Sequence, residues 1–132
     1  MENIRVFNCN MELTLDIIGG KWKPIIIYHV GNNEKMRYGE LKRLIPSINE
    51  RVLSRELREL EQKGIVTRDE FKEKVLRVEY SLTDIGNDVL PLLNSLTEWG
   101  NKYNQQELEV FSLICINMTI RIFNTGQTNK YI

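Results

Sequence analysis

An amphipathic stretch from Pro46 to Lys63 constrains the fold of this 132-residue chain more than any other segment. A helix turns about 100° per residue, so three leucines of this stretch fall on one face and three arginines on the nearly opposite face. The leucines are Leu53, Leu57 and Leu60, and the arginines are Arg51, Arg55 and Arg58. The pattern predicts a helix that packs on a core through one face and presents guanidinium groups to an external partner on the other.

Residues at both ends of the stretch fit a helix of limited length. Pro46 ends any helix that precedes it, Asn49 can cap the free N–H groups, and Gly64 can stop the C-terminus. Ile48, just before the cap, can pack on Leu53 as a hydrophobic staple. The alternative is an ordinary surface helix whose arginines are balanced by glutamates. These are Glu50, Glu56, Glu59 and Glu61.

The charge of the chain is unevenly distributed, although 18 basic and 18 acidic side chains cancel overall. From Lys21 to Arg77 there are 14 Lys or Arg and 9 Asp or Glu, an excess of 5 basic groups. The segments on either side are acidic. A local basic patch can bind phosphates even when the total charge is zero. The length and the 42% hydrophobic content fit one domain with its own core.

Cysteine usage and the apolar runs predict a cytoplasmic protein. Cys9 and Cys115 are far apart and no zinc-binding spacing is present. The N-terminus lacks the apolar segment of a signal peptide. The most apolar run, Val110–Phe123, is too short to span a membrane and contains Asn117 and Arg121. We therefore expect reduced thiols, no metal or other cofactor, and no membrane partner.

Two helices are predicted before the amphipathic stretch. The first covers Met11–Ile18, with inward side chains at Leu13, Ile17 and Ile18. Pro24 and the apolar run after it predict a second, buried helix of about ten residues, although its three consecutive isoleucines leave a strand open. His29 lies in this run, where a satisfied core residue is favoured over a metal ligand.

Lys21 and Lys23 flank the start of the second helix. Cations gain nothing from the helix dipole at that end. The pair therefore hints at an external anion such as a phosphate, and two solvated lysines are the alternative.

A helix-turn-helix is predicted around Pro46. A short strand at Met36–Tyr38 precedes a helix at Glu40–Ile45, whose inward residues are expected to be Leu41, Leu44 and Ile45. A turn of about four residues then leads to the amphipathic helix. In such a unit the second helix lies in the major groove of DNA.

A β-hairpin is predicted directly after the helix-turn-helix, from strands at Ile65–Phe71 and Arg77–Leu82. Together they predict a winged helix, mainly α with a small β-hairpin wing. Lys72 and Lys74 at the hairpin tip, with Arg77 nearby, suit the sugar-phosphate backbone or a minor groove. The alternative is a solvated charged turn.

A long final helix is predicted from Asp84 to about Tyr103, capped by Thr83 and kinked at Pro91. Its apolar stripe comprises Ile85, Val89, Leu92, Leu93, Leu96, Trp99 and Tyr103. Because one small domain does not need this much apolar surface, we expect a homodimer. Residues 105–132 form an extension that could be a helix, an edge strand or a tail, with Cys115 as a buried apolar residue.

Short motifs follow one another from Cys9 to Gly100. They are Leu15–Trp22, Tyr38–Leu41, Asn49–Ser54, Leu57–Leu60, Gly64–Val66, Arg77–Thr83, Gly86, Pro91 and Trp99–Gly100. In order and spacing the chain resembles the HxlR-type winged helix-turn-helix transcriptional regulators of bacteria. The resemblance implies a homodimeric DNA-binding regulator, expected to be a repressor and without enzymatic activity. The domain would cover residues 1–104.

This resemblance and the charge pattern together assign roles to residues. The recognition-helix residues expected at double-stranded DNA are Arg51, Ser54, Arg55 and Arg58. Additional backbone contacts are expected from Lys21, Lys23, Arg37 and Tyr38. The dimer interface is expected at Leu13, Leu92, Leu96, Trp99 and Tyr103. Two recognition helices would then enter successive major grooves, about 34 Å apart, on an inverted-repeat operator.

Some members of this family sense electrophiles or oxidants through a cysteine just before the first helix, where Cys9 stands. A helix N-terminus favours the reactive thiolate. The family usually has proline after this cysteine, whereas here Asn10 follows, and its wing tip is commonly rich in proline, whereas here it reads Lys72–Val75. A sensing role and a merely half-buried thiol are both open, and no small-molecule effector has a residue signature.

Two other functional classes compete with a DNA-binding regulator. An enzyme has little support, because the chain has one histidine, no recognisable carboxylate pair and no glycine-rich phosphate loop. A winged helix used for protein–protein contact is kept open by the four glutamates on the recognition helix. Salt distinguishes this module from a DNA-binding protein, because DNA affinity falls steeply with salt.

Overall fold

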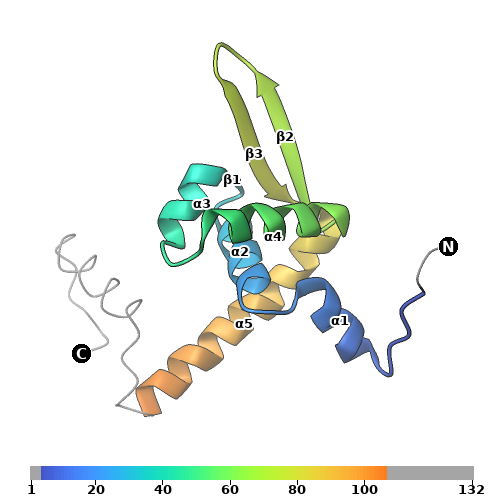
Figure 1. The fold of residues 1–132 in the computed structure, drawn as a ribbon. Coiled ribbons are helices and arrows are strands. Elements are labelled where there is room, and N and C mark those ends of the chain that lie inside the picture. The colour runs from blue at the N-terminus through green and yellow to red at the C-terminus, as the bar shows by residue number, and fades with distance from the viewer. Residues whose placement is uncertain (1–3, 107–132) are drawn as a thin grey trace. The chain divides into compact units, whose positions relative to one another are not determined.

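The computed structural model describes residues 4–106. Its elements are α1 (Asn10–Ile18), α2 (Trp22–Asn32), β1 (Lys35–Arg37), α3 (Tyr38–Leu44), α4 (Glu50–Gln62), β2 (Val66–Lys72), β3 (Leu76–Leu82) and α5 (Asp84–Gln106) (Figure 1). This arrangement confirms the predicted α+β winged helix-turn-helix. The chain divides into two compact units inside α5, after Asn94, and the predicted domain boundary near residue 104 stays a prediction.

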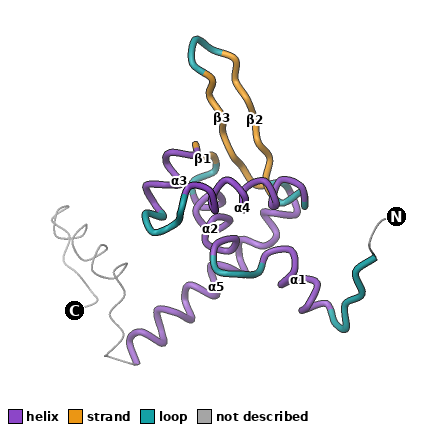
Figure 2. The backbone as a smooth tube through the Cα atoms, in the orientation of Figure 1, coloured by secondary structure: helices purple, strands orange, loops and turns teal. Residues whose placement is uncertain are grey.

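The core of the first unit forms where α2 packs beneath α4 (Figure 2). Both helices contribute fully buried side chains. These are Ile26, Ile27 and Val30 from α2, and Leu53, Leu57 and Leu60 from α4. The strand alternative for the isoleucine run is therefore wrong. Pro24 is accommodated because the first turn of a helix has no intrahelical acceptor for its N–H groups.

The turn between α3 and α4 is held by apolar and polar contacts. Ile45 and Ile48 are buried in the core. The Asn49 side chain accepts a hydrogen bond of 2.8 Å from the backbone N–H of Arg51, which confirms the predicted cap. The inward placement expected for Leu44 is wrong, because this side chain is 38% exposed.

Helix α3 begins at Tyr38, two residues earlier than predicted. The carboxylate of Glu40 accepts a hydrogen bond of 3.2 Å from the backbone N–H of Arg37, which fixes the start of the helix. The preceding strand therefore ends at Arg37 and excludes Tyr38.

The sheet has the strand order β1-β3-β2, with both pairs antiparallel. The wing strands lie within one residue of the predicted ranges. β1 pairs only with the base of β3, from Lys35↔Ser81 to Arg37↔Glu79, whereas β2 and β3 stay paired out to Lys72↔Leu76. The outer half of the wing is therefore a two-stranded ribbon (Figure 1).

Gly64 ends the recognition helix as predicted. Its φ of +71° lies in the left-handed region, which favours glycine. The N–H of Gly64 bonds the Glu61 carbonyl at 3.0 Å, and the N–H of Ile65 bonds the Leu60 carbonyl at 2.9 Å. These two bonds satisfy carbonyls that the helix end would leave free.

Thr83 joins the end of α4 to the start of α5. Its hydroxyl donates to the Gly64 carbonyl at 2.6 Å and accepts from the Gly86 N–H at 3.1 Å, which confirms the predicted cap. Its backbone N–H donates to the Ile65 carbonyl at 3.0 Å. One residue thus connects recognition helix, wing and final helix.

Helices α1 and α5 carry exposed apolar side chains. On α1, Ile17 and Ile18 pack against the core, but Leu13 is exposed, so its inward placement within one chain is wrong. On α5, Leu93 is buried in the core. The exposed side chains of α5 are Ile85, Leu92, Leu96, Trp99 and Tyr103.

Several predictions fall beyond these contacts. Pro91 lies inside α5, and the expected kink stays a prediction. The apolar run Val110–Phe123 and Cys115 lie outside the described residues, as does nearly all of the predicted extension. Among the helices of residues 4–106, none is both long and apolar enough to cross a membrane.

Candidate nucleic-acid interface

The outer face of α4 carries the side chains that the sequence assigns to DNA. Arg51, Ser54, Arg55 and Arg58 are all exposed. Their positions follow from the burial of the leucine face, because turning the leucines inward turns these residues outward. Within residues 4–106, no ion pair engages Arg51 or Arg58, so both guanidinium groups are available to an external partner.

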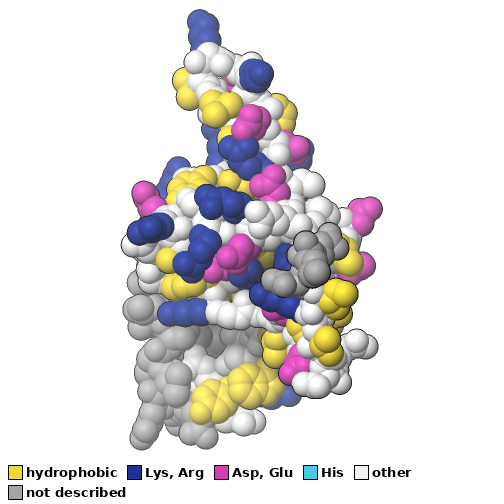
Figure 3. All heavy atoms as spheres, turned by 45° about the vertical axis from the view of Figure 1, so that its right-hand side comes forward, with side chains coloured by type: hydrophobic (Ala, Val, Ile, Leu, Met, Phe, Trp, Pro, Cys, Tyr) yellow, Lys and Arg dark blue, Asp and Glu magenta, His cyan; other side chains and the backbone are white. Residues whose placement is uncertain are grey.

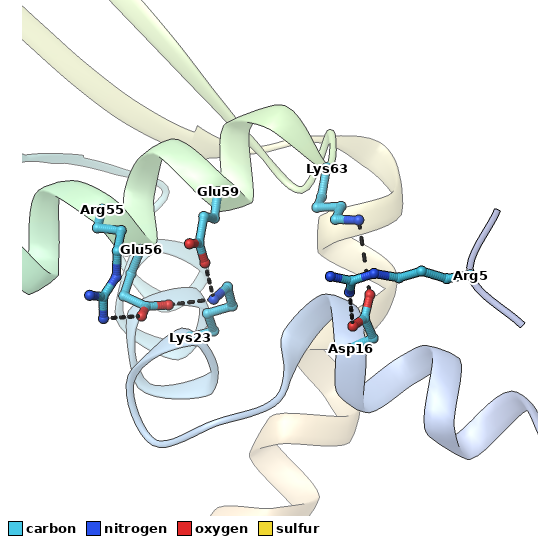
Figure 4. A network of polar contacts seen from close by, with 7 residues as sticks. All are labelled: Arg5, Asp16, Lys23, Arg55, Glu56, Glu59 and Lys63. Carbon is cyan, nitrogen blue, oxygen red and sulfur yellow. Dashed lines mark hydrogen bonds and ion pairs between the residues drawn. The ribbon is translucent and has the colours of Figure 1, made fainter. Parts of the chain in front are cut away.

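Two of the four glutamates on α4, Glu56 and Glu59, form ion pairs with Lys23 of α2. The Lys23 ammonium lies 2.5 Å from Glu56 Oε2 and 2.5 Å from Glu59 Oε2 (Figure 4). Glu56 also contacts Arg55, with 3.3 Å between Oε1 and Nη2. The glutamates therefore do not form a general neutralising layer over the arginines, as the surface-helix alternative requires.

Lys23 is consequently placed differently from the sequence expectation. Its side chain is only 14% exposed and points to two carboxylates instead of outward. Burial alone lowers the pKa of Lys23, but the hydrogen bonds to Glu56 and Glu59 and the negative charges of these groups together outweigh it, so the pKa is raised. The same bond from Lys23 lowers the pKa of Glu59. This arrangement argues against a phosphate contact by Lys23, whereas Lys21 is exposed, with its ammonium 4.5 Å from the Trp22 ring centroid.

Tyr38 fastens α3 to the start of α4. Its hydroxyl donates to the Glu50 carbonyl at 2.9 Å and lies 3.3 Å from Ser54 Oγ. Arg37, the preceding residue, is exposed. Tyr38 thus helps to position the Ser54 side chain. The sequence does not reveal this contact, because no local pattern links residues sixteen positions apart.

The wing presents lysines at its tip but holds its arginine against its own strands. Lys72 and Lys74 are exposed, and Lys and Arg side chains extend to the end of the wing, with acidic groups among them (Figure 3). The Arg77 guanidinium lies 4.3 Å from the Phe71 ring centroid. Carboxylate oxygens of Glu73 and Glu79 lie within 3.6 Å of nitrogens of the same guanidinium. Arg77 therefore stabilises the ribbon, whereas no ion pair within residues 4–106 engages Lys72 or Lys74.

Cys9 is an exposed free thiol at the N-cap position of α1. The predicted helix start beside this cysteine is therefore confirmed. The same helix reaches the recognition helix through Asp16, which lies 2.5 Å from Arg5 Nη1 and 4.0 Å from Lys63 Nζ (Figure 4). This connection was not predicted, because no sequence pattern links Arg5, Asp16 and Lys63.

His29 is half-buried in α2, with its ring edge-on to that of Tyr28. Burial lowers the pKa of His29, which favours the neutral ring. In the described part of the chain, no three His, Cys, Asp or Glu side chains are grouped to hold a metal ion. These observations fit a core residue.

The fold and the exposed arginine face define a winged helix-turn-helix DNA-binding regulator, and the comparisons identify its family. The model of the HxlR-like helix-turn-helix family matches residues 17–108. The HTH-type transcriptional regulator YkvN of Bacillus subtilis is 42% identical over 104 residues, which cover 79% of this chain and 87% of YkvN. The chain therefore belongs to the HxlR family of transcriptional regulators, a class of DNA-binding proteins rather than enzymes, and the resemblance seen in the sequence is confirmed.

Solved structures of a redox regulator, HypR, and of the transcriptional regulator YodB are also similar. The redox regulator HypR in its reduced form has a TM-score of 0.69 and 44% identity, covering 78% of this chain and all of HypR. Its oxidised form has a TM-score of 0.68 and 46% identity, covering 71% of this chain and 96% of HypR. Diamide-treated YodB from B. subtilis has a TM-score of 0.60 and 29% identity, covering 75% of this chain and 97% of YodB.

Proposed function

We propose that this regulator represses transcription by binding an inverted-repeat operator as a homodimer. The two α4 helices would enter successive major grooves about 34 Å apart. The observation that carries the proposal is the outward row of Arg51, Ser54, Arg55 and Arg58 on a helix whose opposite face is fully buried. The row lies on the second helix of the helix-turn-helix, within the residues 17–108 that match a family of transcriptional regulators.

The placement of each side chain supports a division of roles. Arg51 and Arg55, nearer the N-terminus of α4, read base edges, because an arginine fork matches the two acceptors of guanine. Ser54 and Arg58 contact the backbone. Further backbone contacts come from Lys21, Arg37, Lys72 and Lys74, all of them exposed. Three other side chains stabilise the interface through contacts inside the protein. Lys23 pairs with Glu56, Tyr38 bonds the Glu50 carbonyl, and Arg77 packs on Phe71.

Exposed apolar side chains support the dimer. Leu92 is 60% exposed, Trp99 is 65% exposed and stacks on Tyr103, and Leu13 and Leu96 are exposed as well. Large apolar side chains gathered on a helix are typical of surfaces that another chain covers. A two-fold symmetric dimer would use the same surface twice and match a palindromic operator.

The direct test is fluorescence anisotropy of the reduced full-length protein with DNA from upstream of its own gene, in the presence of excess non-specific competitor. Binding that resists the competitor and weakens log-linearly with salt supports the proposal. A shuffled sequence of the same composition is the control. If neither DNA binds at low salt, the protein-interaction module becomes the better description of this surface.

The wing lysines should act through charge alone. We expect Lys72→Ala to weaken binding to operator and shuffled DNA by the same factor and to reduce the slope of log K against log salt by about two, one for each protomer of the dimer. Lys35→Ala, which removes an exposed lysine from β1 at the base of the sheet, is the matched control. An unchanged slope for Lys72→Ala would remove the wing tip from the interface.

We further propose that oxidation or alkylation of Cys9 changes DNA affinity. The support is an exposed thiol at the start of α1, a helix whose Asp16 lies 4.0 Å from Lys63 at the C-cap of α4, in a chain similar to the redox regulator HypR. Modification there would alter how α1 holds the recognition helix.

We expect diamide or N-ethylmaleimide to change operator affinity at least several-fold, because allosteric coupling is typically about 1–3 kcal/mol. The change should vanish in Cys9→Ser and persist in Cys115→Ser. Equal affinities for reduced, oxidised and Cys9→Ser protein would exclude sensing through this thiol.

A further inference from the structure

Four side chains of alternating charge form a continuous chain beneath the recognition face. The order is Arg55, Glu56, Lys23, Glu59 (Figure 4). Lys23 and Glu56 are nearly buried, with side chains 14% and 11% exposed, whereas Arg55 is 58% exposed at the outer end. The charges of the four groups sum to zero, so the network adds no net charge to the interface.

Glu56 divides its two oxygens between two different cations. Oε2 bonds the Lys23 ammonium at 2.5 Å, and Oε1 lies 3.3 Å from Arg55 Nη2. The buried ion pair fixes the carboxylate, because a buried charge that lost its partner would be strongly destabilised. Lys23 itself belongs to the first turn of α2, three residues before the buried Ile26. The Arg55 guanidinium is thereby linked to the core through Glu56 and Lys23.

A guanidinium has five N–H donors, so a contact through one nitrogen leaves others open. A side chain held in one orientation before binding also loses less conformational freedom when it binds. These two effects favour contact with a base edge, because that contact requires a fixed orientation of the guanidinium. A phosphate contact depends mainly on charge and gains less from them.

We infer that Glu56, anchored by Lys23, is a positioning residue that orients Arg55 for base recognition. The inference deepens the proposed function and rests on its assignment of Arg55 to a base edge. Lys23 therefore contributes to DNA recognition indirectly. It holds the Glu56 carboxylate, which in turn orients Arg55.

A double-mutant cycle tests the inference in the full chain. The quantity measured is the ratio of affinities for operator and shuffled DNA, determined by anisotropy at one salt concentration. This ratio cancels any general gain in affinity from the loss of a negative charge. Glu56→Gln should lower it by roughly tenfold, within the range that a single arginine–base contact supplies. In an Arg55→Ala background, Glu56→Gln should lower it no further.

Glu59→Gln is the matched control, because it removes the same charge and another bond to Lys23, while the hydrogen bond to Arg55 belongs to Glu56. It should leave the ratio unchanged. Thermal unfolding verifies that each variant is folded. If Glu56→Gln does not fold, Glu56→Asp replaces it, since the shorter side chain keeps the charge but withdraws the carboxylate from its two partners.

Each outcome is decisive. A ratio that Glu56→Gln leaves unchanged, or lowers equally with and without Arg55, overturns the positioning role. A ratio that Arg55→Ala itself leaves unchanged overturns the proposed base contact, and the inference with it. That last result is distinguishable because it appears in the single Arg55 variant.

Discussion

Arg51→Ala should produce the largest loss of operator affinity among single substitutions on the DNA-facing surface. An arginine–base contact is worth about 1–3 kcal/mol of discrimination, and a homodimer loses two of them, so we expect a loss of roughly 2–6 kcal/mol per operator. Arg51 makes no ion pair within residues 4–106, so its removal leaves no buried charge behind. Anisotropy titrations with operator variants measure the effect and locate the base pair at which the preference relaxes.

Arg5→Ala is the control for that substitution. Arg5 carries the same charge but bonds Asp16 on α1 instead of facing outward from α4. We expect it to leave operator affinity nearly unchanged. If Arg51→Ala and Arg5→Ala had equal effects, the outer face of α4 would not be the recognition surface.

Gly86→Ala should be among the most destabilising single-methyl additions in the described residues. A Cβ at this position would lie 2.2 Å from the Ile65 carbonyl oxygen, where real Cβ atoms are essentially never found. The oxygen belongs to the backbone that joins α4 to the wing, and it already accepts the Thr83 N–H. This oxygen cannot move away without breaking its hydrogen bond from the Thr83 N–H. Overpacking of this kind costs about 1–3 kcal/mol, and sometimes more.

Gly100→Ala supplies the opposite expectation in the same helix. A Cβ there meets no atom within 4 Å, so only helix propensity changes, and alanine is favoured over glycine by about 0.8–1 kcal/mol. Urea unfolding of the full chain measures both variants. A Gly86→Ala protein as stable as the wild type would mean that α5 does not start against Ile65 as described.

Local patterns allowed most of the elements to be predicted from the sequence. The leucine spacing on α4, the Asn49 cap and the Gly64 stop each act within a few residues, and the structure confirms all three. The wing strands were predicted to within one residue, because alternation and turn residues are also local. The row of exposed arginines follows from the same periodicity.

Contacts between distant residues explain what the sequence did not reveal. Lys23 reads as a free cation at a helix start, yet its partners lie 33 and 36 residues away. Arg77 is predicted from the sequence as a wing residue at DNA, but the sequence does not reveal that its guanidinium lies over Phe71 on the neighbouring strand. Charge is visible in a sequence, but the side chain that neutralises it is decided by packing.

Leu13 and Leu44 show a second limit. Both occupy positions that helical periodicity turns inward, and both are exposed in a single chain. Periodicity identifies an apolar face, but it does not say whether the same chain or another covers that face. For Leu13 a second copy of the chain is the proposed cover.

The ribbon at the outer half of the wing has a consequence for how such regulators diversify. Beyond the reach of β1, each added cross-strand pair lengthens the ribbon by about 3.3 Å and keeps the alternation of its two faces. Paired insertions or deletions near Glu73–Val75 would therefore change the length of the wing without disturbing the hydrogen bonds of Thr83. Under the proposed wing contact, relatives with wings of different length would cover different lengths of DNA while keeping one recognition helix.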